Sequence, residues 1–274
     1  MRKIGLRSAV FTLFLPAFSL AQGGYFANWF ARVDKTQAEQ PNWIVPLATS
    51  TARLEEAYHY DSLWQENSKG VMIENYGGGK GFSLIPAERV QVNLNLPPYV
   101  VQNNPKIQNG WGDASFAVKY RLLSANEKSG NYVLTGYLAL SWPTGQYENG
   151  APHPVITPTI AYGKGVGRFD LQGTAGVGLP TAGTSMFGRN ITWNNAFQYH
   201  LFRKFWPEAE LNSTFFQNGK NNGKKQNFVM LGFVIGRLHL IGRMRLSFGG
   251  GYQIATTHFH TNNHNAILTV RFPF

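Results

Sequence analysis

The stretch that decides the fold is His264-Asn265-Ala266-Ile267-Leu268-Thr269-Val270-Arg271-Phe272-Pro273-Phe274. Every second residue from Ala266 to Phe274 is apolar, and most of the residues between them are polar. A period of two predicts a β-strand with one apolar and one polar face. A last strand whose apolar face ends on an aromatic residue is typical of a transmembrane β-barrel, because that strand closes against the first and its outer face meets lipid. We therefore predict a barrel that this strand closes.

The composition agrees with a barrel rather than with a bundle of membrane helices. Charged residues make up 14% of the 274 residues and aromatic residues another 14%, whereas about 25% charged residues is usual in globular proteins. The mean hydropathy is -0.23, which argues against a helical membrane protein. There are no cysteines, which excludes disulfides and thiolate chemistry. The formal charge of +11 is spread along the chain without a basic helix, so we expect anionic lipid rather than nucleic acid as its partner.

The beginning of the sequence carries the features of an export signal. Basic residues precede an apolar run from Ala9 to Leu20, which is too short to span a bilayer. Small residues at Ser19 and Ala21 predict cleavage after Ala21. Export together with a closed transmembrane barrel predicts the outer membrane of a Gram-negative bacterium as the location. The expected organisation is a signal peptide at 1–21, a periplasmic or lumen-tucked segment at 22–52 and a transmembrane β-barrel at 53–274.

Alternating stretches recur along the whole predicted barrel. They predict an all-β, transmembrane, antiparallel up-and-down barrel of about 12 strands. Long connections such as Thr256–Asn262 alternate with short ones such as Arg237–His239, as outer loops and periplasmic turns do in outer-membrane barrels. The predicted strands are Arg53–Gln65, Gly70–Gly77 (the weakest), Glu88–Val101, Asp113–Leu123, Asn131–Trp142, Pro154–Gly163, Arg168–Leu179, Asn190–Leu201, Phe205–Phe216, Gln226–Gly236, Leu240–Ile254 and the final strand.

Two motifs resemble a known family. Gly110-Trp111-Gly112-Asp113 is followed by Ala117-Val118-Lys119-Tyr120-Arg121-Leu122-Leu123, and Leu140-Ser141-Trp142-Pro143-Thr144-Gly145 comes later. Together they are similar to the pattern of the outer-membrane proteins called meta-pathway phenol-degradation-like, which are distantly similar to long-chain fatty-acid transporter barrels. The similarity spans about Arg53 to Phe274. It implies a β-barrel that passes small hydrophobic or aromatic compounds, and a terminal Phe274 that the outer-membrane assembly machinery reads.

The polar faces of the strands supply the first candidate site. An Arg or Lys side chain that faces hydrocarbon costs about 2–4 kcal/mol at the bilayer midplane, so charged residues on these faces should point into the lumen. They either line a selective pore or hold together a lumen plugged by residues 22–52. On these faces Glu208 and Glu210 can pair with Arg243, Arg245 or Arg271. The predicted lumen-lining residues are Lys119, Arg121, Asp170, Glu208, Glu210, Arg243, Arg245 and Arg271.

Histidines near the C-terminus supply the second candidate site. His258 and His260 share one strand face, so their imidazoles can chelate one metal ion, with His264 as a third ligand. The alternative is a polar outer loop that faces water. The glycine-rich stretches Gly77–Ser83 and Gly163–Gly167 read as turns, because no helix follows either of them. We expect no cofactor.

The function we expect is passive transport. A charged lumen within a membrane barrel favours an outer-membrane channel for small hydrophobic or aromatic solutes. The alternatives are a non-conducting structural or adhesive barrel with a plugged lumen, and a soluble secreted β-sandwich. An enzyme is not expected, because no nucleophile motif is present. The expected partners are outer-membrane lipid and lipopolysaccharide, the assembly machinery through Phe274, and a small hydrophobic solute.

Overall fold

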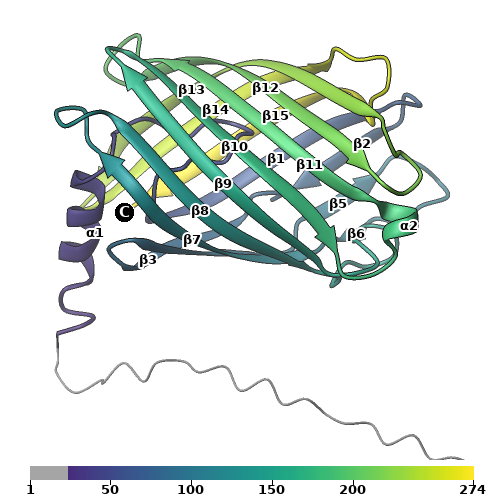
Figure 1. Cartoon of the computed structure of the whole chain (residues 1–274), viewed down its shortest axis with the longest axis horizontal. Coiled ribbons are helices and arrows are strands. Elements are labelled where there is room, and N and C mark those ends of the chain that lie inside the picture. The colour runs from purple at the N-terminus through teal and green to yellow at the C-terminus, as the bar shows by residue number, and fades with distance from the viewer. Residues whose placement is uncertain (1–23) are drawn as a thin grey trace, which may run out of the picture.

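The structure is a computed structural model that describes residues 24–274. The predicted signal peptide lies outside the described residues. The described chain forms one closed antiparallel barrel with twelve strand positions around the ring. The last strand, β15, pairs with the first, β1 (Figure 1). Closure pairs every backbone group around the ring, as a lipid environment requires. The predicted barrel and its strand number are confirmed.

Nine of the twelve strand positions are each filled by one continuous strand, and the other three are each filled by two shorter strands in line. The single strands are β1 Ala57–Asn67, β8 Tyr132–Trp142, β9 Val155–Val166, β10 Phe169–Pro180, β11 Arg189–Tyr199, β12 Phe205–Gln217, β13 Lys225–Ile241, β14 Met244–Ala255 and β15 Asn262–Pro273. The strands that share a position are β2 Met72–Tyr76 with β3 Gly81–Ala87, β4 Val90–Asn95 with β5 Tyr99–Gln102, and β6 Gly110–Trp111 with β7 Ala114–Ala125.

The weakest predicted strand, Gly70–Gly77, is present as β2, but it fills only half of its strand position, and β3 fills the other half. After Tyr76 the chain leaves the ladder, and the amides of Gly77 and Gly78 both donate to the Asp61 carbonyl. The chain then rejoins β1 as β3, which the sequence reading missed. Glycine permits this excursion, because Gly77 has a φ of +86°.

The predicted turn Arg237–His239 was wrong. Strand β13 continues to Ile241, and the turn to β14 lies at Gly242 and Arg243. The pairing between β13 and β14 shifts register after Ile235 and again after His239. Within this irregular stretch Arg237 adopts a φ of +59°, a value typical of turns, and the strand continues beyond it.

The two-residue turns 88–89, 167–168 and 242–243 lie at one end of the barrel, and the longer loops 143–154, 181–188 and 218–224 lie at the other (Figure 1). Helix α1, Trp29–Ala38, and the C-terminus lie at the short-turn end. The small helix α2, Thr184–Phe187, lies in a loop at the opposite end. Short turns mark the periplasmic side of outer-membrane barrels, so we expect the end that carries α1 to face the periplasm and call it the periplasmic end. Within residues 24–274, no helix has the length and apolar character needed to cross a bilayer.

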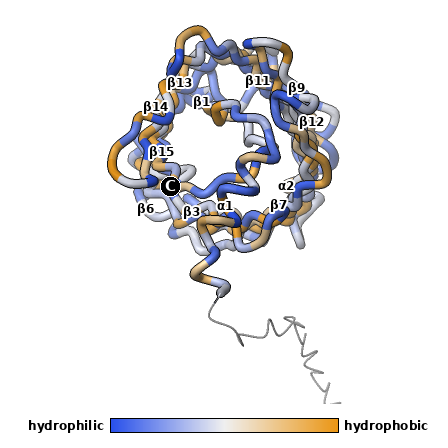
Figure 2. Tube along the Cα trace, turned by 90° about the vertical axis from the view of Figure 1, so that its left-hand side faces the viewer, coloured by the Kyte–Doolittle hydropathy of each residue, from blue (hydrophilic) through white to orange (hydrophobic). Residues whose placement is uncertain are grey.

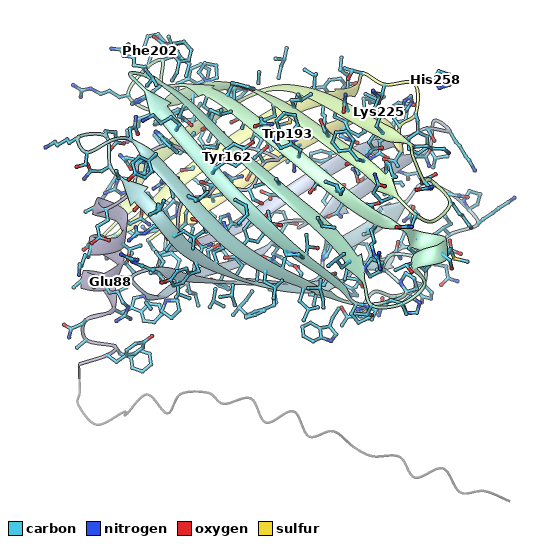
Figure 3. All side chains as sticks on the ribbon, in the orientation of Figure 1. Glu88, Tyr162, Trp193, Phe202, Lys225 and His258 are labelled. Carbon is cyan, nitrogen blue, oxygen red and sulfur yellow. The ribbon has the colours of Figure 1, made fainter. Side chains whose placement is uncertain are left out.

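The outer face of the wall is apolar. Leu138, Phe197, Leu231 and Tyr252 are each more than half exposed. Figure 3 shows Tyr162 and Trp193 on the wall, where the Trp193 indole donates to the Tyr162 hydroxyl at 2.9 Å. An exposed apolar surface of this extent is stable only against lipid.

The inner face is polar, and the N-terminal part of the chain runs through it. Figure 2, which looks into the end that carries α1, shows the chain crossing the interior of the ring. The terminal strand keeps the predicted faces: Thr269 and Arg271 are buried inside, whereas Leu268 is 48% exposed outside. Pro273 is the last residue of β15, and the Phe274 amide beyond it donates to the Glu56 carbonyl at 3.1 Å.

Candidate functional site: the lumen and its N-terminal segment

Residues 40–56, which we call the lumen segment, lie inside the barrel. The segment leaves α1, enters the lumen and returns to the start of β1 without regular secondary structure. Most of its side chains are buried, and Ala52 and Leu54 are fully so. An irregular segment inside a barrel must find hydrogen-bond partners for its backbone, because the strands use theirs in the wall.

Two glutamates of β12 bind the amides of this segment. Glu208 accepts the Leu47 N–H at 3.0 Å. Glu210 accepts the Ala48 N–H through Oε1 and the Thr49 N–H through Oε2, each at 2.8 Å. The Thr49 hydroxyl also donates to Glu210 Oε2, at 2.6 Å. Within the described chain these carboxylates are not in ion pairs, so their predicted pairing with arginines was wrong: backbone amides take that place.

Basic and amide side chains bind the carbonyls of the same segment. Arg271 donates to the carbonyls of Val45 and Pro46 at 2.8 and 2.7 Å. The Lys119 ammonium donates to the Thr51 carbonyl at 3.0 Å. Acids therefore bind its N–H groups and bases its C=O groups, so the lumen holds this segment chiefly through its backbone.

The apolar side chains of the segment rest on glycines of the wall. A Cβ atom at Gly236 would lie 2.3 Å from Ile44 Cδ1, and one at Gly251 would lie 2.8 Å from Leu47 Cδ1. A Cβ at Gly163 would lie 2.5 Å from the Trp43 ring. Each buried apolar cluster in the described chain contains residues from 24–56 together with residues of the wall. The missing side chains of these glycines leave the space that the apolar side chains of the segment occupy, and we call these positions the glycine seats.

We predict that Gly236→Ala loosens the lumen segment. The new methyl group must displace Ile44, and overpacking of this kind costs about 1–3 kcal/mol. Because the chain has no cysteine, Ala52→Cys provides a unique thiol that is buried while the segment is docked. The measurement is the maleimide labelling rate of that thiol, which should rise by about tenfold for every 1.4 kcal/mol.

Gly136→Ala is the matched control for this substitution, because the nearest atom to its new Cβ would be Ile160 Cδ1 at 3.8 Å. Equal labelling rates in the Gly236 and Gly136 variants would contradict the seating of Ile44.

Helix α1 lies at the rim of the periplasmic mouth beside this segment (Figure 2). Val33 packs with Leu54 and Ile85 inside the mouth. Arg243, in the turn between β13 and β14, donates to both carboxylate oxygens of Asp34 on α1, at 2.5 and 3.0 Å. The hydrogen bond from Arg243 lowers the pKa of Asp34 below its usual value. One bidentate contact thus joins α1 to the last periplasmic turn.

We predict that acid weakens this contact. Because the folded pKa of Asp34 is lowered, its contribution is present above the unfolded value near 3.8 and is lost as the pH falls through the folded pKa. Amide hydrogen exchange of α1, corrected for intrinsic rates, should lose protection at low pH in the wild type. The Asp34→Asn variant should lack this step. The effect is small, because both side chains are well exposed to solvent and salt.

Cavities lie beside the lumen segment. Deep in the barrel, a cavity of about 190 Å³ lies against residues 45–51 of the segment and is lined on the wall by His59, Asp61, Ser83, Asn93 and Lys119, among others. At the periplasmic mouth, cavities of about 370 and 390 Å³ flank Arg237, whose guanidinium donates to the carbonyls of Asn42 and Trp43. We call the deep cavity the outer chamber and the two cavities at the mouth the periplasmic vestibule.

The structure divides the predicted lumen residues into two groups. Arg243 and Arg245 are exposed at the periplasmic mouth rather than enclosed, because β14 begins only at Met244. The residues enclosed inside the barrel are Lys119, Arg121, Asp170, Glu208, Glu210 and Arg271. Arg121 reaches α1, where it donates to the Thr36 carbonyl at 2.8 Å.

The predicted histidine ligands are not brought together. His260 uses both ring nitrogens, against the Thr257 carbonyl and the Asn263 side chain. His264 lies beside Glu66 and stacks on Tyr252. In the described part of the chain, no group of three potential ligands is placed to hold a metal ion. His260 hydrogen-bonds within its own loop instead.

Several residues that hold the segment were missed. Gln172 donates to the Ile44 carbonyl and accepts from the Thr51 hydroxyl, and Thr135 donates to the Ala52 carbonyl. Strand parity places both residues on the polar faces, so the alternation was a usable signal. Arg53 lies within the segment and donates to the Trp43 carbonyl, a role that no local pattern indicates.

A closed barrel with an apolar exterior, a polar lumen and short periplasmic turns defines an outer-membrane, channel-like β-barrel. The chain belongs to the family described as "Putative MetA-pathway of phenol degradation", whose model matches residues 69–265. The family resemblance seen in the sequence is thereby confirmed. No curated protein sequence matches this chain.

A solved outer-membrane channel shares the fold, and two other barrel structures are less similar. The COG4313 outer-membrane channel from Pseudomonas putida F1 is 14% identical with a TM-score of 0.58, and the match covers 85% of this chain and 100% of that one. The translocator domain of the autotransporter NalP from Neisseria meningitidis is 14% identical with a TM-score of 0.44, covering 80% and 87%. The transport unit of AIDA-I from Escherichia coli is 10% identical with a TM-score of 0.44, covering 89% and 97%.

Proposed function

We propose that the protein is an outer-membrane channel for small hydrophobic or aromatic solutes, and that the lumen segment controls its passage. The observation that carries this proposal is the polar lumen with chambers beside a segment held mainly through its backbone. A segment held in this way can leave its place at the cost of a few apolar contacts, because Trp43, Ile44 and Leu47 are the side chains that rest on glycines of the wall.

The chemistry of the outer chamber supports a hydroxylated aromatic solute. The family description names phenol degradation, and a phenol presents one hydroxyl group on an apolar ring. His59, Asp61 and Asn93 offer donors and acceptors for such a hydroxyl at the wall of the chamber. A passive route needs such contacts to be few, because tight binding would slow release.

A second candidate is a non-conducting barrel, which the buried contacts of the lumen segment favour. Single-channel current in planar bilayers, with and without catechol on the outer side, separates the two. A channel should conduct ions and show brief current interruptions with catechol but not with mannitol. A silent wild-type barrel that conducts only once its segment is removed supports the second candidate. A silent barrel in both forms contradicts the channel.

A further inference from the structure

A cleft at the periplasmic rim has lipid-facing walls on one side and cationic side chains on the other. It lies between the end of α1 and the end of β7, with a volume of about 500 Å³. Its apolar wall includes Leu122, Leu123 and Tyr132, which are 42%, 57% and 38% exposed. Its polar wall includes Lys35, Arg89 and Ser129. The rim of a membrane barrel is where such a mixed surface meets the lipid head groups.

A bulge in β7 makes the apolar wall. The pairing of β7 with β8 shifts register between Arg121 and Leu123, which leaves Leu122 as the extra residue. Arg121 therefore points inward, with only 3% of its surface exposed, while both leucines that follow point outward. The pair extends the lipid-facing band of the barrel to the edge of the cleft.

The polar wall has unused hydrogen-bond donors. Arg89 is exposed, in the turn between β3 and β4, and among residues 24–274 its guanidinium has no hydrogen-bond or ion-pair partner. Lys35 donates to Glu88 at 2.8 Å, which leaves two of its three N–H groups free. Within the cleft, Glu39 supplies the one carboxylate, and Arg121 binds it at 2.6 Å. The cleft therefore keeps a net positive charge.

Aromatic residues before α1 place this rim at the membrane surface. The Tyr25 hydroxyl donates to the Pro86 carbonyl at 2.9 Å, on the strand whose outward side chains include Phe82. Phe26 is 75% exposed and lies against Tyr25 with ring centroids 5.2 Å apart. Exposed aromatic residues of this kind lie at the interface between hydrocarbon and head groups. Glu88, beside the cleft, is labelled at this end of the barrel in Figure 3.

We propose that this cleft binds an anionic phospholipid of the periplasmic leaflet, with its phosphate at Arg89 and Lys35 and an acyl chain along Leu122 and Leu123. The occupant is a lipid rather than free phosphate, because the cationic groups adjoin the lipid-facing band without a break. A guanidinium and an ammonium together suit a phosphodiester, which accepts several charge-assisted hydrogen bonds. A bound lipid would also fill the space between α1 and the wall.

Native mass spectrometry of the detergent-purified full chain tests this proposal. The probes are phosphatidylglycerol and phosphatidylcholine with the same acyl chains. The wild type should retain phosphatidylglycerol about tenfold better, and Lys35→Gln combined with Arg89→Gln should remove that preference. The control is Arg168→Gln with Arg203→Gln, which removes the same charge from other periplasmic turns and should keep the preference.

Three results would overturn the proposal. Equal retention of the two lipids by the wild type would show that the cleft does not recognise the anionic head group. An equal loss in the control variant would show that overall charge, and not this cleft, attracts the lipid. Binding of inorganic phosphate alone that displaces no lipid would make the site a free anion site. A Leu123→Ser variant that keeps the fold should weaken both lipids alike, because it removes only the contact with the acyl chain.

Discussion

Removing residues 24–53 should raise the single-channel conductance several-fold. This stretch contains α1 and almost all of the lumen segment, so its removal joins the outer chamber to the periplasmic vestibule. Including Arg53 in the deletion avoids leaving its buried guanidinium without the carbonyls of Pro41 and Trp43. Water then solvates Glu210, Lys119 and the other groups that held the segment, so the lumen becomes a continuous aqueous path.

A variant of unchanged length distinguishes the mere presence of a chain in the lumen from the docking of its side chains against the wall. Replacing residues 40–53 with glycine and serine keeps α1 attached but removes the side chains that fill the seats. It should give conductance between that of the wild type and that of the deletion, with more frequent current fluctuations. Heat-dependent gel mobility checks that each barrel stays folded. Unchanged conductance in the folded deletion variant would show that the segment does not obstruct the path.

The wall of the barrel could be predicted from the sequence because it obeys a local rule. A period of two assigns each side chain to lipid or lumen, and that rule placed Lys119, Glu210 and Arg271 inside. It failed where the ladder is interrupted. The excursion at Gly77 and Gly78 depends on bonds to the Asp61 carbonyl, which is distant in sequence, so the alternation gave no sign of β3.

The contents of the lumen could not be predicted in the same way. The partners of Glu210 and Arg271 are backbone groups of the lumen segment, and every residue except proline presents the same amide and carbonyl. No residue type therefore marks where these charges bind. The glycine seats offered a signal, because Gly249 and Gly251 on the inner face of β14 leave room for the Leu47 side chain. That signal shows where space exists but not what fills it.

Glu210→Gln should release the middle of the lumen segment, at Ala48 and Thr49, from the wall of the barrel. The carboxylate accepts the N–H groups of Ala48 and Thr49 and the Thr49 hydroxyl, whereas a carboxamide keeps one oxygen and turns an NH₂ group toward those donors. Hydrogen bonds to a charged acceptor contribute about 1.5–3 kcal/mol each, so docking should weaken by about 3 kcal/mol or more. Labelling of the Ala52→Cys thiol should then accelerate by about a hundredfold, and channel openings should lengthen.

The control is Glu66→Gln, which makes the same chemical change at the outer rim, where Glu66 contacts Asn263 and His264 instead of the segment. It should leave the labelling rate unchanged. Combining each substitution with Thr49→Val completes the test. Glu210→Gln and Thr49→Val should be strongly non-additive, because both remove the same hydroxyl–carboxylate contact, while Glu66→Gln and Thr49→Val should add. Additivity in both pairs would show that Glu210 affects the lumen only through its charge and not by binding this segment.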